Sequence, residues 1–357
     1  MPTSIVTGGA GFVGSNLAAT LQARGHHVIV VDPFRSGSFA NLNEACARLN
    51  AGPFRGEVLP LSSRQLRWGE GFPGPVKPAA VFHLGAITDT TLADEGEMLR
   101  ENVEGFEPML RWAFLHHVPL VYASSAATYG TPPQARDRTP FPEDAAGLPS
   151  NVYGFSKWMM EQVHHRVWLE HSRESPVYAV DPHARVGPHV VGLRFFNVFG
   201  PGESRKGKMA SMVFQLAWQM LAGKSPSLFR DGSQARDQVY IDDVVECTLK
   251  AAEPDAKPGV YNLGSGRATS FNEIVEAIRR GLGIASLSPD GFQSDLGHSG
   301  PGRTTYIDMP ATIRAFYQDY TCADLTRTRA GLRWEPRHEP LDAVAAYARY
   351  LRDHLPR

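Results

Sequence analysis

The sequence predicts an α/β protein, in which a doubly wound parallel sheet is accompanied by a smaller C-terminal α/β domain. Three observations support this fold class. Short apolar runs alternate with longer amphipathic segments along the first half of the chain. These runs lack the polar alternation of a half-exposed strand, as expected where helices cover both faces of a parallel sheet. A glycine-rich turn joins the first run to the first helical segment.

The predicted strands are spaced widely enough for crossover helices between them. The apolar runs cover residues 4–9, 27–32, 79–86, 119–125 and 189–200, with a further strand over 259–266. Between them, residues 102–117 place Val103, Phe106 and Leu110 on one stripe of a helix. Strands that alternate with helices in this way indicate βαβ units and therefore a parallel sheet.

The second half of the chain is richer in loops. Glycine and proline become frequent after Gly200, and we expect one helix from about residue 209 to 221. The stretches 172–189 and 281–303 have an irregular pattern. The predicted limits are residues 1–175 for the sheet domain, to which 189–200 and about 239–262 return, and 176–357 for most of the smaller domain.

Composition and charge exclude several classes of function. The 36 basic and 37 acidic residues give a formal net charge of -1, so we expect no nucleic-acid partner and no membrane surface. No apolar run approaches the roughly 20 residues of a membrane span, and the N-terminus enters a strand pattern without a signal peptide. Three separated cysteines and three His doublets lack metal-ligand spacing. We therefore expect a cytoplasmic protein without a metal site.

The segment TGGAGFVG lies between the first predicted strand and a helix. Gly8 permits a tight turn, Gly11 lets the backbone approach a pyrophosphate, and Gly14 lets the helix pack closely on the strand. Phe12 and Val13 open the helix, where free N–H groups and the helix dipole favour phosphate. This pattern predicts a Rossmann dinucleotide-binding domain with NADP or NAD as cofactor.

Two residues near the end of the second strand bear on the form of the cofactor. Asp32 follows that strand and would bond the adenosine ribose hydroxyls, which favours NAD. Arg35 could instead accommodate a 2′-phosphate, which favours NADP. The sequence leaves both forms open.

A candidate catalytic set follows from a strand end and a helix start. Tyr153 and Lys157 are four residues apart and share a helix face, while Ser125 ends the strand over residues 119–125. A nearby ammonium favours the phenolate, so we expect the pKa of Tyr153 to fall from about 10 towards neutrality. Tyr153 would then act as a general base, with Ser125 bonded to the same oxygen.

These motifs, together with RDQVYIDDV (236–244), resemble the extended short-chain dehydrogenase/reductase family of nucleotide-sugar enzymes. Within that family the sequence is most similar to the ADP-L-glycero-D-manno-heptose 6-epimerases. The similar segments are YASSAATYG (122–130), NVYGFSK (151–157), FFNVFGPGESRKGKMASM (195–212), YNLGSGRATSFNEI (261–274) and YQDYTCADL (317–325).

The resemblance implies an isomerase that inverts a sugar carbinol. A tightly bound NAD(P) takes a hydride from a sugar carbon and returns it to the opposite face. The substrate would be a small nucleotide-diphosphate sugar, bound mainly by the C-terminal domain, and the protein is expected to be a homo-oligomer. The resemblance assigns Tyr153 and Lys157 to catalysis and to cofactor binding. It assigns six residues to the substrate: Ser124, Ser125, Asn197, Lys206, Arg236 and Tyr317. Arg236 would bind the diphosphate, because a guanidinium can donate two parallel hydrogen bonds to it.

By the same resemblance, Lys206 is a second acid/base group on the face of the sugar opposite Tyr153. Its neighbours Arg205 and Lys208 are expected to face phosphate or solvent. The alternative is a lysine that only holds the ADP phosphates. For the whole protein, the alternatives are a UDP-hexose 4-epimerase, another nucleotide-sugar epimerase or reductase, and an NAD(P)-binding sensor without catalysis.

Overall fold

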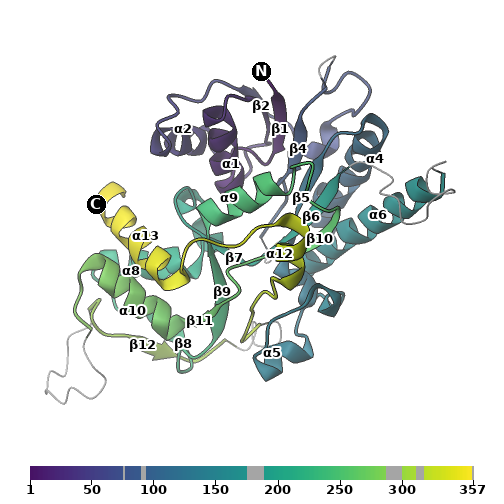
Figure 1. The fold of residues 1–357 in the computed structure, drawn as a ribbon. Helices are drawn as coiled ribbons and strands as arrows, with labels where there is room; N and C mark the ends of the chain where they lie inside the picture. The colour runs from purple at the N-terminus through teal and green to yellow at the C-terminus, as the bar shows by residue number, and fades with distance from the viewer. Residues whose placement is uncertain (75–76, 90–93, 175–188, 287–299, 311–316, 356–357) are drawn as a thin grey trace, which may run out of the picture.

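A computed structural model describes residues 1–357 except 75–76, 90–93, 175–188, 287–299, 311–316 and 356–357. Its centre is a seven-stranded parallel sheet with the strand order β10-β6-β5-β4-β1-β2-β3 (Figure 1). The strands are β1 (Thr3–Thr7), β2 (His27–Val31), β3 (Glu57–Leu59), β4 (Ala80–His83), β5 (Leu120–Ser125), β6 (Val190–Phe195) and β10 (Gly259–Leu263). The predicted fold class is therefore confirmed.

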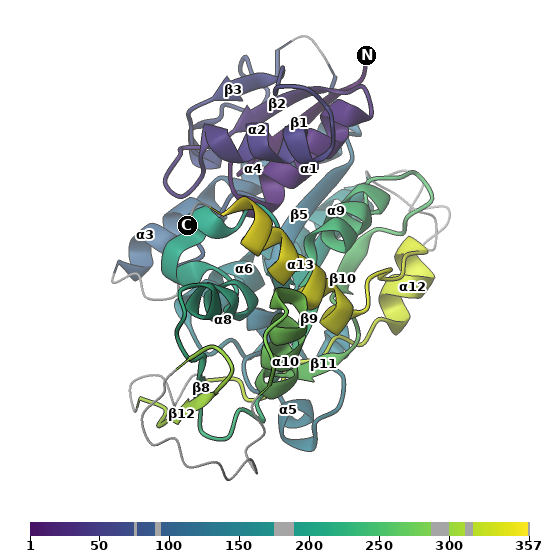
Figure 2. The same ribbon diagram turned by 90° about the vertical axis from the view of Figure 1, so that its left-hand side faces the viewer.

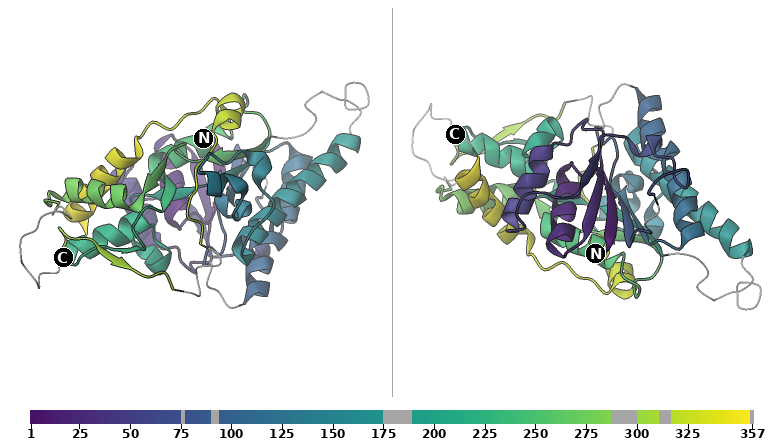
Figure 3. Two further views of the ribbon diagram at one scale, coloured as in Figure 1. Left: turned by 90° about the horizontal axis from the view of Figure 1, so that it is seen from below. Right: turned by 90° about the horizontal axis from the view of Figure 1, so that it is seen from above.

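Helices cover both faces of this sheet, as the apolar strands predicted (Figure 3). On β1, Val6 packs with α1 (Phe12–Ala23), α2 (Phe39–Arg48) and α9 (Ile241–Lys250) on one face. Its neighbour Ile5 packs with α4 (Phe106–His116) and α6 (Val152–Glu174) on the other face. Adjacent strand residues point to opposite faces, so a strand covered on both sides must be apolar throughout.

The predicted strand over 189–200 is wrong in one respect, because the structure divides it at Phe196. β6 stays in the large sheet, whereas β7 (Asn197–Phe199) pairs in parallel with β9 (Ala235–Tyr240) in a three-stranded sheet. The backbone N–H of Phe196 donates to Leu263 O at 2.9 Å, the last hydrogen bond towards β10 before the strand leaves. The third strand of this sheet is β11 (Ala268–Ser270), antiparallel to β9.

Three helices form a separate apolar cluster beside the large sheet (Figure 2). They are α8 (Met212–Leu221), α10 (Phe271–Leu282) and α13 (Pro340–His354). The predicted helix over 209–221 begins later, at Met212, because the Ser211 hydroxyl caps it by accepting a hydrogen bond from the Phe214 N–H at 3.1 Å. The predicted helix over 102–117 divides into the π-helix η2 (Arg100–Glu104) and α4.

The remaining elements are short. They are the strands β8 (Ser227–Phe229) and β12 (Thr305–Ile307), the helices α3 (Glu95–Leu99), α5 (Pro133–Asp137) and α12 (Thr326–Leu332), and the 3-10 helices η1 (Ser63–Gln65), η3 (Ala126–Tyr129), η4 (Glu143–Ala145) and η5 (Ser204–Met209). Most of the two irregular stretches, 172–189 and 281–303, lies outside the described residues. No described helix combines the length and apolar character that crossing a membrane requires.

Candidate active site

The glycine-rich turn has the geometry of a phosphate cradle. Gly8 has a φ of 66°, and a side chain there would come within 2.6 Å of the backbone nitrogen of Gly85. A side chain on Gly14 would overlap the carbonyl oxygen of Gly8. A side chain on Gly11 would meet only that same oxygen, at 3.2 Å, and no side chain caps the first turn of α1. The backbone N–H groups of Phe12 and Val13, in the first turn of α1, thus fit a dinucleotide pyrophosphate.

Asp32 follows β2 directly and lies next to this turn. Its carboxylate accepts hydrogen bonds from the Ala10 N–H at 2.9 Å and the Phe34 N–H at 2.8 Å. Burial raises the pKa of Asp32, and these backbone donors oppose the shift. Arg35 lies in the following loop, where its guanidinium forms an ion pair with Glu97 of α3. The residue that could accommodate a 2′-phosphate therefore contacts a carboxylate in this structure.

Ser125, Tyr153 and Lys157 come together at the carboxyl end of β5. A side-chain hydrogen bond joins Ser125 to Tyr153. The Asn151 side chain caps the start of α6 by accepting a hydrogen bond from the Gly154 N–H at 2.8 Å, which fixes the turn that carries Tyr153. One turn later, the Lys157 ammonium is buried and donates to the Ala123 carbonyl at 2.9 Å. The predicted trio thus shares one end of the central strand.

The expected direction of the Tyr153 pKa is wrong for this structure. Burial raises the pKa of Tyr153, and the hydrogen bond with Ser125 only opposes the shift. The Lys157 ammonium is itself desolvated, which lowers its pKa to about 8. The physical reason is that burial disfavours both the phenolate and the ammonium. The sequence shows which residues are neighbours, but it does not show how deeply they are buried.

Asn102 is a site residue that the sequence did not identify. It is buried in η2, where its amide nitrogen donates to Ser156 Oγ at 3.0 Å and to Ile87 O at 3.1 Å. Its side-chain oxygen accepts from the Ile87 N–H at 2.7 Å. Asn102 thus connects the loop after β4 to Ser156 of α6, the residue that precedes Lys157. The π-helix that turns it inward has no clear sequence signal.

His83 ends β4 beside these residues. Its Nδ1 lies 2.7 Å from Thr7 Oγ1, while its buried Nε2 has no hydrogen-bond partner among the described residues. Burial and the nearby Lys157 lower the pKa of His83 to about 3. Among the described residues, His83 is therefore hydrogen-bonded through only one of its two ring nitrogens.

The structure does not bring Ser124 to the site. Ser124 is 2% exposed, and its hydroxyl donates to Glu161 of α6. Glu161 is also bound by Arg194, at the end of β6, through two hydrogen bonds of 2.9 and 2.7 Å. The reason is the strand period: Ser124 and Ser125 are adjacent on β5 and point to opposite faces.

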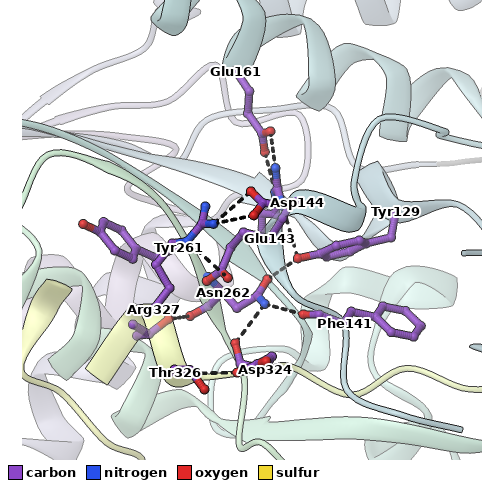
Figure 4. A network of polar contacts seen from close by, with 12 residues as sticks. Tyr129, Phe141, Glu143, Asp144, Glu161, Tyr261, Asn262, Asp324, Thr326 and Arg327 are labelled. Atoms are coloured by element: carbon purple, nitrogen blue, oxygen red, sulfur yellow. Dashed lines mark hydrogen bonds and ion pairs between the residues drawn. The ribbon is translucent and has the colours of Figure 1, made fainter. Parts of the chain in front are cut away.

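The pair of Arg194 and Glu161 belongs to a larger buried network (Figure 4). Arg194 donates to Tyr129 Oη at 3.1 Å, and the Tyr129 hydroxyl donates to Asn262 Oδ1 at 2.6 Å. The Asn262 amide nitrogen donates in turn to the carbonyls of Phe141 at 2.8 Å and Asp324 at 3.0 Å. The network thus ties the end of β5 to two chain segments, around Phe141 and Asp324, that are hydrogen-bonded to each other.

Arg236 and Tyr317 lie together, as the resemblance implies. Arg236 is on β9 and is 8% exposed, and its guanidinium lies 5.0 Å from the centre of the Tyr317 ring. A side-chain hydrogen bond also joins the two residues. Asn197 is exposed on the neighbouring strand β7, opposite Gln238 of β9. The small sheet therefore carries two of the expected substrate residues, Arg236 and Asn197, and a third, Tyr317, contacts Arg236.

The three cations of η5 have different surroundings. Lys206 is partly buried, with its ammonium 5.4 Å from the centre of the Phe12 ring. Burial lowers the pKa of Lys206, and the nearby Glu203 carboxylate opposes the shift. Arg205 and Lys208 were expected to face phosphate or solvent, but they form ion pairs with Glu44 and Asp89. No group of three or more described His, Cys, Asp or Glu residues is arranged to hold a metal ion.

Comparison with known proteins gives a consistent result. Residues 4–264 match the model of the NAD dependent epimerase/dehydratase family. The ADP-L-glycero-D-manno-heptose-6-epimerase of Helicobacter pylori is 32% identical, with a TM-score of 0.73 over 98% of this chain and 96% of that one. The UDP-glucose 4-epimerase of Thermotoga maritima is 25% identical, with a TM-score of 0.76 over 99% of this chain and 100% of that one. A UDP-N-acetylglucosamine 4-epimerase from Methanobrevibacter ruminantium, 21% identical with a TM-score of 0.78 over 99% of each chain, shares the fold.

These matches confirm the prediction of an NAD-dependent sugar-nucleotide epimerase at the level of the family. They extend over both the glycine-rich turn and the residues around Tyr153. The chain belongs to the NAD dependent epimerase/dehydratase family.

Proposed function

We propose that this protein is a nucleotide-sugar epimerase that inverts a carbinol carbon, and that its substrate is an ADP-glycero-manno-heptose inverted at C6. One observation carries the proposal. Two groups that can exchange protons come from different elements to the edge where β1 and β5 end: Tyr153 on α6, and Lys206 on η5 beside Phe12. The carbinol oxygen must lose a proton when its carbon is oxidised and regain one when the hydride returns to the opposite face, and two such groups can supply this without the sugar turning over in the site.

The bound nicotinamide would supply the redox chemistry, as the acceptor of a hydride from the sugar carbon and the donor of the same hydride back to it. The chain must therefore provide binding, orientation and proton transfer. The glycine-rich turn and Asp32 would hold the dinucleotide. Arg236 and Tyr317 would hold the diphosphate of the sugar nucleotide, where a buried guanidinium is a strong ligand. The substrate carbinol would then lie near Tyr153.

The two proton-transfer groups have complementary tendencies. Burial raises the pKa of Tyr153, so the phenol is suited to donate a proton to a carbonyl oxygen that is being reduced. Burial lowers the pKa of Lys206, so the amine is suited to accept the carbinol proton during oxidation. In the reverse direction each group takes the other role. Ser125 would orient the phenol through their hydrogen bond.

The heptose substrate is favoured by the Helicobacter pylori relative, which at 32% identity is more similar in sequence than the Thermotoga maritima enzyme at 25%. A UDP-hexose 4-epimerase is the second candidate, because the Thermotoga maritima enzyme covers the whole chain at 25% identity. Such an enzyme needs the set of Ser125, Tyr153 and Lys157 but does not need Lys206. The role of Lys206 therefore separates the two candidates.

The test combines a substrate panel with one substitution. The protein is incubated with ADP-D-glycero-D-manno-heptose and with UDP- and GDP-hexoses, and the epimers are resolved by NMR. We expect inversion at C6 of the heptose, and we expect Lys206→Met to abolish it while leaving bound cofactor unchanged. Lys250→Met removes a lysine of α9 that is paired with Glu253, and serves as the matched control. Full activity of Lys206→Met, or inversion of a UDP-hexose alone, would refute the proposal.

A further inference from the structure

Residues 203–209 cross the dinucleotide side of the protein as a single segment, here called the strap. Near its start, the Arg205 guanidinium binds both carboxylate oxygens of Glu44 on α2, at 2.7 and 2.6 Å. It also donates to Asn41 Oδ1 at 2.9 Å. The Asn41 amide nitrogen in turn donates to the carbonyl of Ala10 in the glycine-rich turn, at 2.9 Å. The strap is therefore connected to one side of the turn.

The rest of the strap reaches the other side of the same turn. Lys206 lies over the ring of Phe12, which opens α1, with 5.4 Å between its ammonium and the ring centre. Lys208 forms an ion pair of 3.2 Å with Asp89, in the segment between β4 and α3. β4 pairs with β1 on the side away from β2, whereas α2 follows β2. The three cations thus span the mouth of the phosphate cradle.

The base of the strap is closed by a buried carboxylate. Glu203 is fully buried and accepts hydrogen bonds from the Gly200 N–H at 3.1 Å and the Ser211 N–H at 2.6 Å. It also accepts from the Ser211 hydroxyl at 2.9 Å. These bonds join the residues before and after the strap. The Asn16 amide nitrogen donates to Pro201 O at 2.9 Å, which attaches this base to α1.

We propose that the strap retains the dinucleotide, and that Arg205 and Lys208 are the residues that fasten it. A cofactor seated on the glycine-rich turn would lie beneath Lys206, so that it could leave only after the strap moved. Glu203 would keep the base in place, while the two outer ion pairs open and close. This inference rests on the cofactor that the family uses, and it does not depend on the sugar or on catalysis by Lys206.

The ion pairs of Arg205 with Glu44 and of Lys208 with Asp89 are weak enough to open and strong enough to slow cofactor release. The Arg205 and Glu44 side chains are 37% and 52% exposed, and those of Lys208 and Asp89 are 67% and 33% exposed. Exposed ion pairs are weak and are screened by salt, so they can open often. Each pair is expected to slow release by up to about fivefold, and the two together by about twentyfold.

The experiment measures cofactor release from the holoprotein. The protein is loaded with radiolabelled NAD or NADP, freed of unbound cofactor, and diluted into an excess of unlabelled cofactor while the retained label is followed. We expect Arg205→Ala/Lys208→Ala to release it about twentyfold faster. We expect Glu44→Gln/Asp89→Asn, which keeps both cations, to accelerate release of the cofactor at least fivefold. Release by the unaltered protein should accelerate as salt rises.

The control removes two paired cations that lie outside the strap, on α10 and α9. Arg280→Ala/Lys250→Ala breaks the ion pairs with Asp342 and Glu253 and should leave release unchanged. Circular dichroism of every variant verifies that it is folded. Unchanged release in both strap variants would overturn the proposal. If only the loss of the cations accelerates release, Arg205 and Lys208 bind the cofactor phosphates directly, and the strap mechanism is equally overturned.

Discussion

The buried pair of Arg194 and Glu161 gives the sharpest prediction of stability. Their side chains are 5% and 4% exposed, and two charged hydrogen bonds join them. Glu161→Gln removes the negative charge, leaves one oxygen for both Arg194 and Ser124, and turns an amide N–H₂ group towards the guanidinium. Removing one partner of a buried pair costs about 3–5 kcal/mol, because the remaining charge has no compensation. For a chain of 357 residues this corresponds to a fall of about 4–7 °C in Tm.

The assay is thermal unfolding of the cofactor-free protein, followed by circular dichroism. Glu253→Gln, which breaks the exposed pair of Lys250 and Glu253, is the control and should shift Tm by less than about 1 °C. A second test uses Arg194→Met/Glu161→Met, which leaves no buried charge at this pair and should be less destabilised than Glu161→Gln. If Glu161→Gln melts within about 1 °C of the unaltered protein, the pair is not buried as described and the reasoning fails.

Two further predictions concern the cofactor turn and the pH dependence of folding. Gly14→Ala places a methyl group against the Gly8 carbonyl, and should weaken cofactor binding roughly ten- to a hundredfold in calorimetric titration; binding within twofold of the unaltered protein would contradict this. Burial lowers the pKa of Lys157 to about 8 from an unfolded value of 10.5, so the unfolded chain binds more protons between these values. The free energy of unfolding, measured by urea titration, should therefore rise by about 3 kcal/mol more between pH 8 and 10.5 in the unaltered protein than in Lys157→Met. If the free energy of unfolding changes with pH in the same way in both proteins, the prediction is refuted.

The sequence predicted most of the large sheet because its strands are apolar on both faces. It missed β3, which has only three residues and none of them buried. It also joined β6 to β7, because the stretch over both strands is mostly apolar and the residue between them, Phe196, is not a turn residue. That division depends on which sheet each half pairs with, and pairing is a tertiary property that local patterns do not contain.

The candidate site was predicted in part for a similar reason. Residues within one motif, such as Tyr153 and Lys157, have a spacing that fixes their relative position. Contacts between distant segments have no such signal, and neither the Arg205 pair with Glu44 nor the inward turn of Asn102 was foreseen. Ser124 was misplaced although the strand period alone separates it from Ser125, and applying that period would have placed it correctly.

The proposed function and the strap support each other through the cofactor. A dehydrogenase must release its reduced cofactor in every turnover, so a device that slows release would limit its rate. An epimerase regenerates its cofactor within one turnover, and release serves no purpose in its cycle. In this chain the proposed acid/base Lys206 lies on the same segment as the fastening residues Arg205 and Lys208. Opening the strap would therefore withdraw the amine as well as free the dinucleotide, so that proton transfer on that face could occur only while the cofactor is enclosed.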